Sequence, residues 1–326
     1  MSYYSDCFRE YVGGGVVIVD TGEVIFKEAY GFADVEGGRE ATPQTNFRLA
    51  SVTKQFTATA IMLLSEEGKL SLDCNLCDLF PRYPSYGSTI SVRHLLNHTS
   101  GVPDYGGLVP SGTEMQLHDL DVLQLLLNTD VPLFPSGTAH QYSNSGYALL
   151  ALIVELVSGR PFYRYIKDEI FDPLGMEQSV VFVRGLTEVP ERAFGYSREG
   201  ENWVRNDQSI WSAILGDGGI YCCLDDFVQW IKGLLDQQLL SETSYTLMYT
   251  PPTIEGKDTG YGFGWYIDTY RSSKRLHHGG GTRGFSTYIE IYPERAGAVA
   301  VLLNQDGINT KTLSRTIVDR WFADSK

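Results

Sequence analysis

Strand-forming segments lie near both ends of this chain, and helix-forming segments fill the part between them. The run 15–31 holds two β-rich stretches joined by Thr21-Gly22, a pattern typical of a β-hairpin. Further strands are expected at 261–268, 285–292 and 297–303. We therefore predict an α/β protein of the α+β type, with one antiparallel sheet built from both chain ends and flanked by helices.

The middle of the chain shows the periodicity of amphipathic helices. Helices are expected over 51–67, 121–128, 145–158 and 161–170, and a last one over about 310–323. No repeat or low-complexity linker divides the 326 residues. The prediction is one domain, 1–326, with a sheet lobe (about 1–69 and 211–326) and an inserted, mostly helical lobe (about 70–210).

Charge and cysteine content exclude several classes of partner and site. The net charge of −14 argues against nucleic acid or an anionic membrane surface as the main partner, and favours a small molecule or peptide. Five cysteines, an odd number in a long chain, favour free thiols in a reducing compartment. The oligomeric state is left open.

The N-terminal residues contain no apolar stretch behind a basic start, and the chain has no uninterrupted apolar run of about 18 residues. As written, the sequence predicts a soluble cytoplasmic protein without membrane insertion. Removal of an export signal from a precursor would instead place it in the periplasm or outside the cell.

Ser51 and Lys54 form a Ser-x-x-Lys pair where the helix 51–67 is expected to begin. One helical turn separates them, so Lys54 can reach the Ser51 hydroxyl as a base beside a nucleophile. For Lys54 to accept a proton near neutral pH, burial must lower its pKa of about 10.4 by roughly three units. The alternative is an ordinary helix start, with Ser51 as N-cap and a solvated lysine.

Two further motifs follow along the chain. Tyr142-Ser143-Asn144 stands directly before the helix 145–158, where Ser143 or Asn144 could also serve only as a cap. His278-Gly279-Gly280 leads into a strand in the β-rich C-terminal part.

Two competing motifs lack the context that they need, and a third is absent. Gly279-x-Gly281-x-x-Gly284 has the spacing of a dinucleotide fingerprint, but a strand follows it where a helix is required. His94 and His98 have zinc-helix spacing but lack the adjacent Glu, and Gly-x-Ser-x-Gly occurs nowhere. We expect neither a metal nor a cofactor.

Ser-x-x-Lys, Tyr-x-Asn and His-Gly-Gly, in this order, resemble the motifs of the penicillin-binding-protein-like serine hydrolases related to class C β-lactamases and DD-peptidases. The segments "LLNHTSGVPDY", "YSNSGYALLALIVELVSGRPF" and "IFDPLGM" are also similar to that family, so the resemblance covers roughly residues 14–305. It implies a β-lactamase/transpeptidase-like fold and acyl transfer to an ester, amide, peptide or β-lactam carbonyl. A catalytically silent relative that acts as a binding or scaffold protein is the alternative.

The resemblance also implies roles for single residues. Ser51 would be the nucleophile, Lys54 and Tyr142 would relay protons, and Asn144 would hold Lys54 and a substrate amide. The N–H groups of Ser51 and Gly281, beside Gly280 of the third motif, would bind the oxyanion.

His278 departs from the lysine that is common at this place in β-lactamases. With a pKa near 6.5 it would be mostly neutral at pH 7 and would gain a proton between pH 8 and 6. We therefore expect weak attraction of substrate carboxylates and inefficient β-lactam hydrolysis. Its neighbour His277 is expected to lie on the other face of the strand with a structural role.

Overall fold

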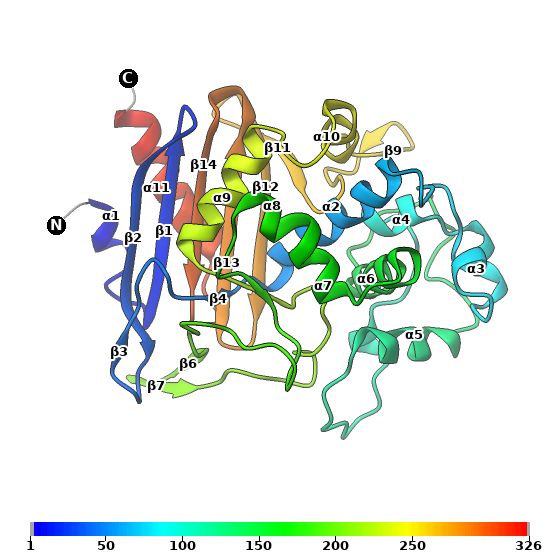
Figure 1. Ribbon diagram of the computed structural model, residues 1–326, viewed down its shortest axis with the longest axis horizontal. Coiled ribbons are helices and arrows are strands. Elements are labelled where there is room, and N and C mark those ends of the chain that lie inside the picture. Colours follow the sequence, from blue (N-terminus) through cyan, green and yellow to red (C-terminus); the bar gives the residue numbers. More distant parts are fainter. Residues whose placement is uncertain (1–2, 325–326) are drawn as a thin grey trace.

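The computed structural model describes residues 3–324 and has a seven-stranded antiparallel sheet at its centre (Figure 1). The strand order is β11-β12-β13-β14-β1-β2-β3. β1 from the N-terminal part pairs with β14 from the C-terminal part, which confirms the expected sheet from both chain ends. The strands of this sheet are β1 (Gly13–Asp20), β2 (Glu23–Asp34), β3 (Arg39–Glu40), β11 (Tyr266–Tyr270), β12 (Ser273–Thr282), β13 (Phe285–Tyr292) and β14 (Gly297–Leu303).

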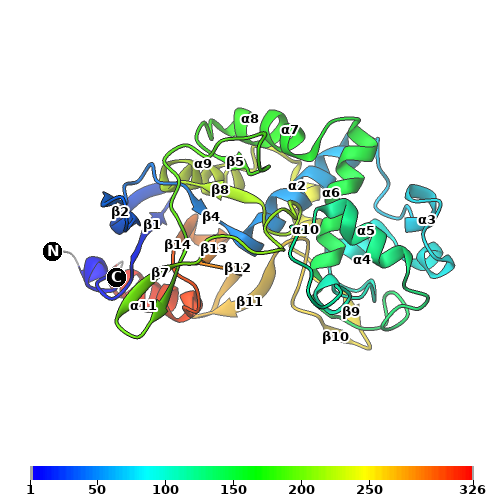
Figure 2. The same ribbon diagram turned by 90° about the horizontal axis from the view of Figure 1, so that it is seen from below.

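Both faces of the sheet are covered. Successive side chains of β1 point to opposite faces, and those on each face are apolar. Val16 and Ile18 pack in one cluster with the C-terminal helix α11 (Thr310–Asp324). Val17 and Val19 belong to the larger core on the opposite face. Figure 2 shows α11 and α9 (Leu224–Leu235) on opposite sides of the sheet.

Most of the remaining helices form the predominantly helical part beside the sheet (Figure 1). The helices expected over 51–67, 121–128 and 145–158 are present, and the helix expected over 161–170 is α7, which continues through a π-helical turn (Lys167–Phe171) into α8. These and the other helices are α1 (Tyr3–Asp6), α2 (Thr53–Glu66), α3 (Leu76–Leu79), α4 (Val92–Leu96), α5 (Asp119–Leu127), α6 (Asn144–Ser158), α7 (Phe162–Ile166), α8 (Asp172–Leu174) and α10 (Glu242–Met248).

Three small sheets complete the fold. The sheet β4-β8-β5 leads the chain into the Ser-x-x-Lys segment, since β4 ends three residues before Ser51. The strands are β4 (Phe47–Arg48), β5 (Val180–Val181), β6 (Tyr196–Glu199), β7 (Asn202–Arg205), β8 (Ile220–Cys222), β9 (Thr253–Ile254) and β10 (Lys257–Asp258).

The strand expected at 261–268 is wrong over its first half, because β11 begins only at Tyr266. The preceding residues turn closely against α2. Gly264 has φ +78°, and a Cβ there would lie 2.9 Å from the carbonyl oxygen of Lys54. A residue with a Cβ does not fit here, and the positive φ of Gly264 differs from the extended backbone of a strand.

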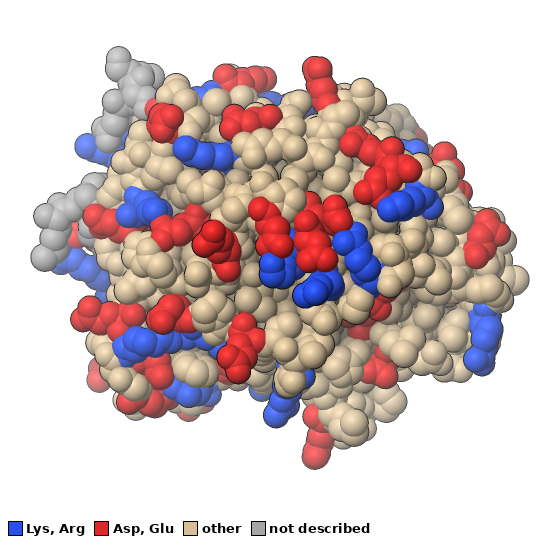
Figure 3. All heavy atoms as spheres, viewed as in Figure 1, with Lys and Arg blue, Asp and Glu red and all other residues tan. Residues whose placement is uncertain are grey.

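On the face shown in Figure 3, acidic and basic side chains are interspersed. None of the helices within residues 3–324 is long and apolar enough to cross a membrane. No disulfide joins the cysteines of the described part of the chain.

Candidate active site

Ser51 lies in a 3₁₀ turn (Ala50–Val52) that runs directly into α2. No side-chain cap bond is made at the start of either element, so N-capping does not explain this serine. Ala50 has φ +49°, a left-handed conformation that costs an alanine about 1–3 kcal/mol. The turn is pressed against β12, where a Cβ on Gly280 would lie 2.2 Å from the carbonyl oxygen of Leu49. Glycine at position 280 therefore allows this close approach.

Lys54 is fully buried in the first turn of α2, and its ammonium group has three oxygen partners. Nζ donates to Ser51 Oγ at 3.1 Å, to Asn144 Oδ1 at 2.8 Å and to the carbonyl oxygen of Asp217 at 3.1 Å. Burial lowers the Lys54 pKa to about 8, although the negative charges of Asp217 and Asp104 oppose this shift. A substantial fraction of Lys54 is therefore neutral at mildly alkaline pH.

Tyr142 and Asn144 reach the same point from the start of α6. The Asn144 side chain accepts a hydrogen bond from Lys54, and its backbone N–H donates to Asp104 Oδ2 at 2.7 Å. Lys54 Nζ lies 4.9 Å from the centre of the Tyr142 ring. Burial raises the Tyr142 pKa, and a side-chain hydrogen bond with Ser51 acts in the opposite direction. Ser51, Lys54, Tyr142 and Asn144 thus form one cluster.

His278 is held as a neutral ring with a defined tautomer. Nδ1 lies 2.7 Å from the Gly279 carbonyl oxygen, which can only accept, so Nδ1 carries the proton. Nε2 lies 3.0 Å from the Tyr261 hydroxyl and accepts its hydrogen bond. The side chain is buried, and burial, followed by the charge of Lys54, lowers the His278 pKa to about 3.

The expected His278 pKa near 6.5, and with it the gain of a proton between pH 8 and 6, is therefore wrong. The sequence pattern does not show that this histidine is buried beside a cation, and both conditions disfavour imidazolium. His277 points elsewhere, with Nδ1 3.0 Å from the Tyr288 hydroxyl and Nε2 3.3 Å from Asp268 Oδ2.

Ser51 stands where two cavities meet. The first cavity, of about 600 Å³, is also lined by Asp104, Asn144 and Gly281. The second cavity, of about 470 Å³, is lined by Tyr142, His278 and Gly280 among others. A Cβ on Gly281 would meet no atom within 4 Å, so the backbone of β12 is open to a ligand at this residue. Volumes of this size are typical of small-molecule sites.

The sequence analysis did not identify the residues around Asp217, whose carbonyl oxygen helps to position Lys54. Asp217 supplies its carbonyl oxygen to Lys54, and its carboxylate accepts a 2.6 Å hydrogen bond from the Tyr105 hydroxyl. Asp119 of α5 accepts from the N–H groups of Leu215 and Gly216, just before Asp217. No local pattern marks these residues as functional. Asp104 and Tyr105 could have been noticed only through the family-like segment "LLNHTSGVPDY".

The remaining histidines of the sequence motifs have structural partners. His94 Nδ1 accepts from the Ser91 N–H at the start of α4, and His98 Nδ1 accepts from the Ser143 N–H. Among residues 3–324 no group of three or more His, Cys, Asp or Glu side chains is arranged to hold a metal ion.

The chain is similar to known proteins over most of its length. The family model described as Beta-lactamase matches residues 6–320. The chain is 32% identical over 316 residues to penicillin-binding protein 4* of Bacillus subtilis, covering 91% of this chain and 69% of that protein. It is 28% identical over 297 residues to a D-aminopeptidase of Gluconobacter oxydans, covering 89% of this chain and 55% of that protein. The crystal structure of a penicillin-binding protein from Bacillus halodurans matches with a TM-score of 0.86 and 29% identity, covering 98% of this chain and 99% of that one.

Proposed function

This chain belongs to the Beta-lactamase family, and we propose that within it the protein is a serine hydrolase that works through an acyl-enzyme. The observation that carries the proposal is the buried Lys54, whose Nζ lies 3.1 Å from Ser51 Oγ and whose pKa is lowered to about 8. A structural lysine gains nothing from a depressed pKa, whereas a general base needs one.

The reaction follows from the contacts of the cluster. Neutral Lys54 accepts the Ser51 proton as Oγ bonds to the substrate carbonyl carbon. Tyr142, hydrogen-bonded to Ser51, gives its hydroxyl proton to the leaving group as the scissile bond breaks, and the proton held by Lys54 then restores the Tyr142 hydroxyl. The N–H groups of Ser51 and Gly281 stabilise the oxyanion. Water then attacks the acyl-enzyme ester, its proton passes through Lys54 and Tyr142 to the departing Ser51 Oγ, and the acid is released.

The relatives support amide and peptide carbonyls as substrates. One is named a D-aminopeptidase, and a D-amino acid amidase of Ochrobactrum anthropi has a related structure, with a TM-score of 0.78 and 25% identity over 93% of this chain and 92% of that one. Esters and β-lactams place a carbonyl carbon at the same point and belong to the same proposal.

A fluorophosphonate probe tests the nucleophile. We expect its mass to appear on the peptide that contains Ser51, because Ser51 is the hydroxyl in contact with Lys54. The Ser51→Ala protein should take up no label, while Ser65→Ala, a change of the serine in the last turn of α2, should be labelled like the parent. Label retained by Ser51→Ala would remove Ser51 as the nucleophile, whereas a parent protein that takes up no label would favour a binding or scaffold role.

The pH profile tests Lys54 and His278 together. Because the Lys54 pKa is about 8 and its neutral form is the active base, kcat/KM should rise with pH and level off above about 9. His278, with a pKa of about 3, stays neutral over this range, so the preference between anionic and neutral esters should be constant within about twofold from pH 6 to 8. A preference for anionic esters that grows towards pH 6 would contradict the buried, neutral His278.

A further inference from the structure

The two cavities at Ser51 divide the substrate into an acyl part and a leaving group. Tyr142 lines the second cavity and Asn144 the first. The proton donor to the leaving group must face it, so on the proposed function the leaving group occupies the second cavity. The acyl part then extends from Ser51 into the first cavity.

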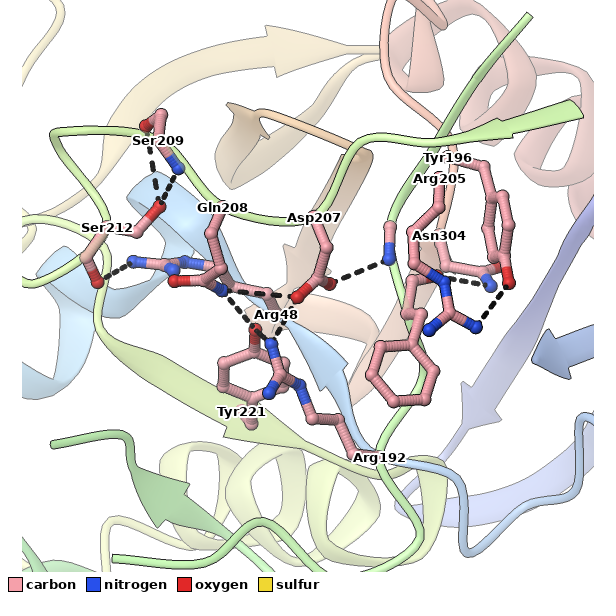
Figure 4. A network of polar contacts seen from close by, with 12 residues as sticks. Arg48, Arg192, Tyr196, Arg205, Asp207, Gln208, Ser209, Ser212, Tyr221 and Asn304 are labelled. Carbon is pink, nitrogen blue, oxygen red and sulfur yellow. Dashed lines mark hydrogen bonds and ion pairs between the residues drawn. The ribbon is translucent and has the colours of Figure 1, made fainter. Parts of the chain in front are cut away.

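The first cavity continues into a third one of about 570 Å³, and the two share Ser209, Trp211 and Arg283 as lining residues. We call these two cavities together the acyl groove. The wall between them is held firmly in the network of Figure 4. Arg48 Nη2 donates to the carbonyl oxygen of Ser212 at 2.9 Å, and the Ser209 N–H donates to Ser212 Oγ at 2.9 Å. The groove is thus formed before any substrate arrives.

Three arginines line the acyl groove: Arg48 and Arg283 in the first cavity, and Arg184 and Arg283 in the third. Arg48 is buried and donates to the carbonyl oxygens of Gly218 and Ser212. In the neighbouring network Arg192 is paired with Asp207 (Figure 4), and Arg205 is paired with Asp34 and Glu36. By contrast, Arg184 and Arg283 are exposed side chains of the acyl groove. Neither has a hydrogen-bond or ion-pair partner among the residues that the structure describes.

The carboxylates of the first cavity are already bound to donors of the protein. Asp104 accepts from the N–H groups of Gly106 and Asn144, and Asp217 accepts from Tyr105. Asp306 accepts from the Ser197 hydroxyl and the Gly284 N–H. Glu114, in the third cavity, forms no ion pair with either arginine in the described part of the chain. Among the charged side chains that line the first cavity, Arg283 is thus the one without a partner in the described part of the chain, while Arg184 and Glu114 have none in the third cavity.

We propose that the acyl groove selects substrates whose acyl part carries a carboxylate several atoms from the scissile carbonyl, bound by Arg283 and, farther out, by Arg184. A guanidinium group offers a planar pair of N–H donors that matches a carboxylate. Arg283 lines both cavities of the groove and Arg184 only the third, so Arg283 serves shorter acyl chains and Arg184 longer ones. The inference rests on the proposed function, because it needs the acyl part in this groove.

Matched p-nitrophenyl esters test this, with acyl chains of four to ten carbons ending in a carboxylate or a carboxamide. The readout is the ratio of kcat/KM for carboxylate over carboxamide. Because both arginines are exposed, we expect a ratio of about three to ten for the best chain length. Arg283→Gln should bring this ratio close to one for the shorter acyl chains. Arg184→Gln should do the same for the longer acyl chains. Arg82→Gln, an equal change of net charge at an exposed arginine outside the groove, should leave it as in the parent.

Calorimetric titration of the Ser51→Ala protein with the same esters gives a readout without turnover. The carboxylate ester should bind more tightly than the carboxamide ester, and Arg283→Gln should remove the difference. A ratio unchanged in both arginine variants, with esters still hydrolysed, overturns the inference and leaves the proposed function standing. Absence of hydrolysis by the parent counts against the proposed function alone, and the titration then decides the inference.

Discussion

Replacement of Lys54 by methionine should lower kcat/KM by at least about 10²–10⁴-fold, the usual contribution of a general base. Methionine retains the volume of the buried side chain but accepts no proton, so Ser51 keeps its place and loses its base. Hydrolysis of a p-nitrophenyl ester measures the loss. Lys257→Met, at an exposed lysine of β10, is the control for the change of net charge.

Removal of Lys54 also leaves Asn144 Oδ1 and the Asp217 carbonyl without their donor, so circular dichroism should first establish that the variant is folded. Activity near the parent value in a folded Lys54→Met protein would exclude this lysine from the mechanism.

Tyr142→Phe is the companion variant, because phenylalanine fills the site but carries no hydroxyl to pass the proton.

The parts of the site that the sequence predicts are those set by local spacing. Ser51 and Lys54 are one helical turn apart, and a helix at that point brings them together whatever the rest of the chain does. The sheet could also be predicted, since strands β13 and β14 follow directly from their apolar runs at 285–292 and 297–303. The family resemblance assigned the three motifs to one site, and in the fold Tyr142 and Asn144 do lie beside Lys54.

The parts that the sequence does not predict depend on contacts between distant segments. The Asp217 carbonyl meets Lys54 across 163 positions of sequence, and a backbone oxygen has no sequence signature. The low His278 pKa results from burial beside Lys54, which only the folded chain shows. Tyr261 reaches His278 because the residues before β11 form a turn instead of the expected strand.

A buried ionic network lies beyond the second cavity, where β11, β12, β13 and α11 meet. Arg275 and Glu290 have fully buried side chains and lie 3.0 Å apart. Glu290 also accepts hydrogen bonds from Tyr292 and Ser314, and Arg275 is paired with Asp268, which in turn contacts His277. This network joins β12, the strand that carries the third motif, to the C-terminal helix α11, so its loss should affect the stability of the whole sheet edge.

Arg275→Met should lower the free energy of unfolding by about 3–5 kcal/mol, because it leaves the Glu290 carboxylate buried without a counter-charge. Chemical denaturation at pH 7 measures the change. The same substitution at Arg271, whose ion pair with Asp319 has side chains 49% and 45% exposed, should cost no more than about 1 kcal/mol. In the double variant Arg275→Met/Glu290→Met the charge is no longer orphaned, so most of the stability should return. A double variant as unstable as Arg275→Met would show that lost packing, and not the unpaired carboxylate, sets the cost.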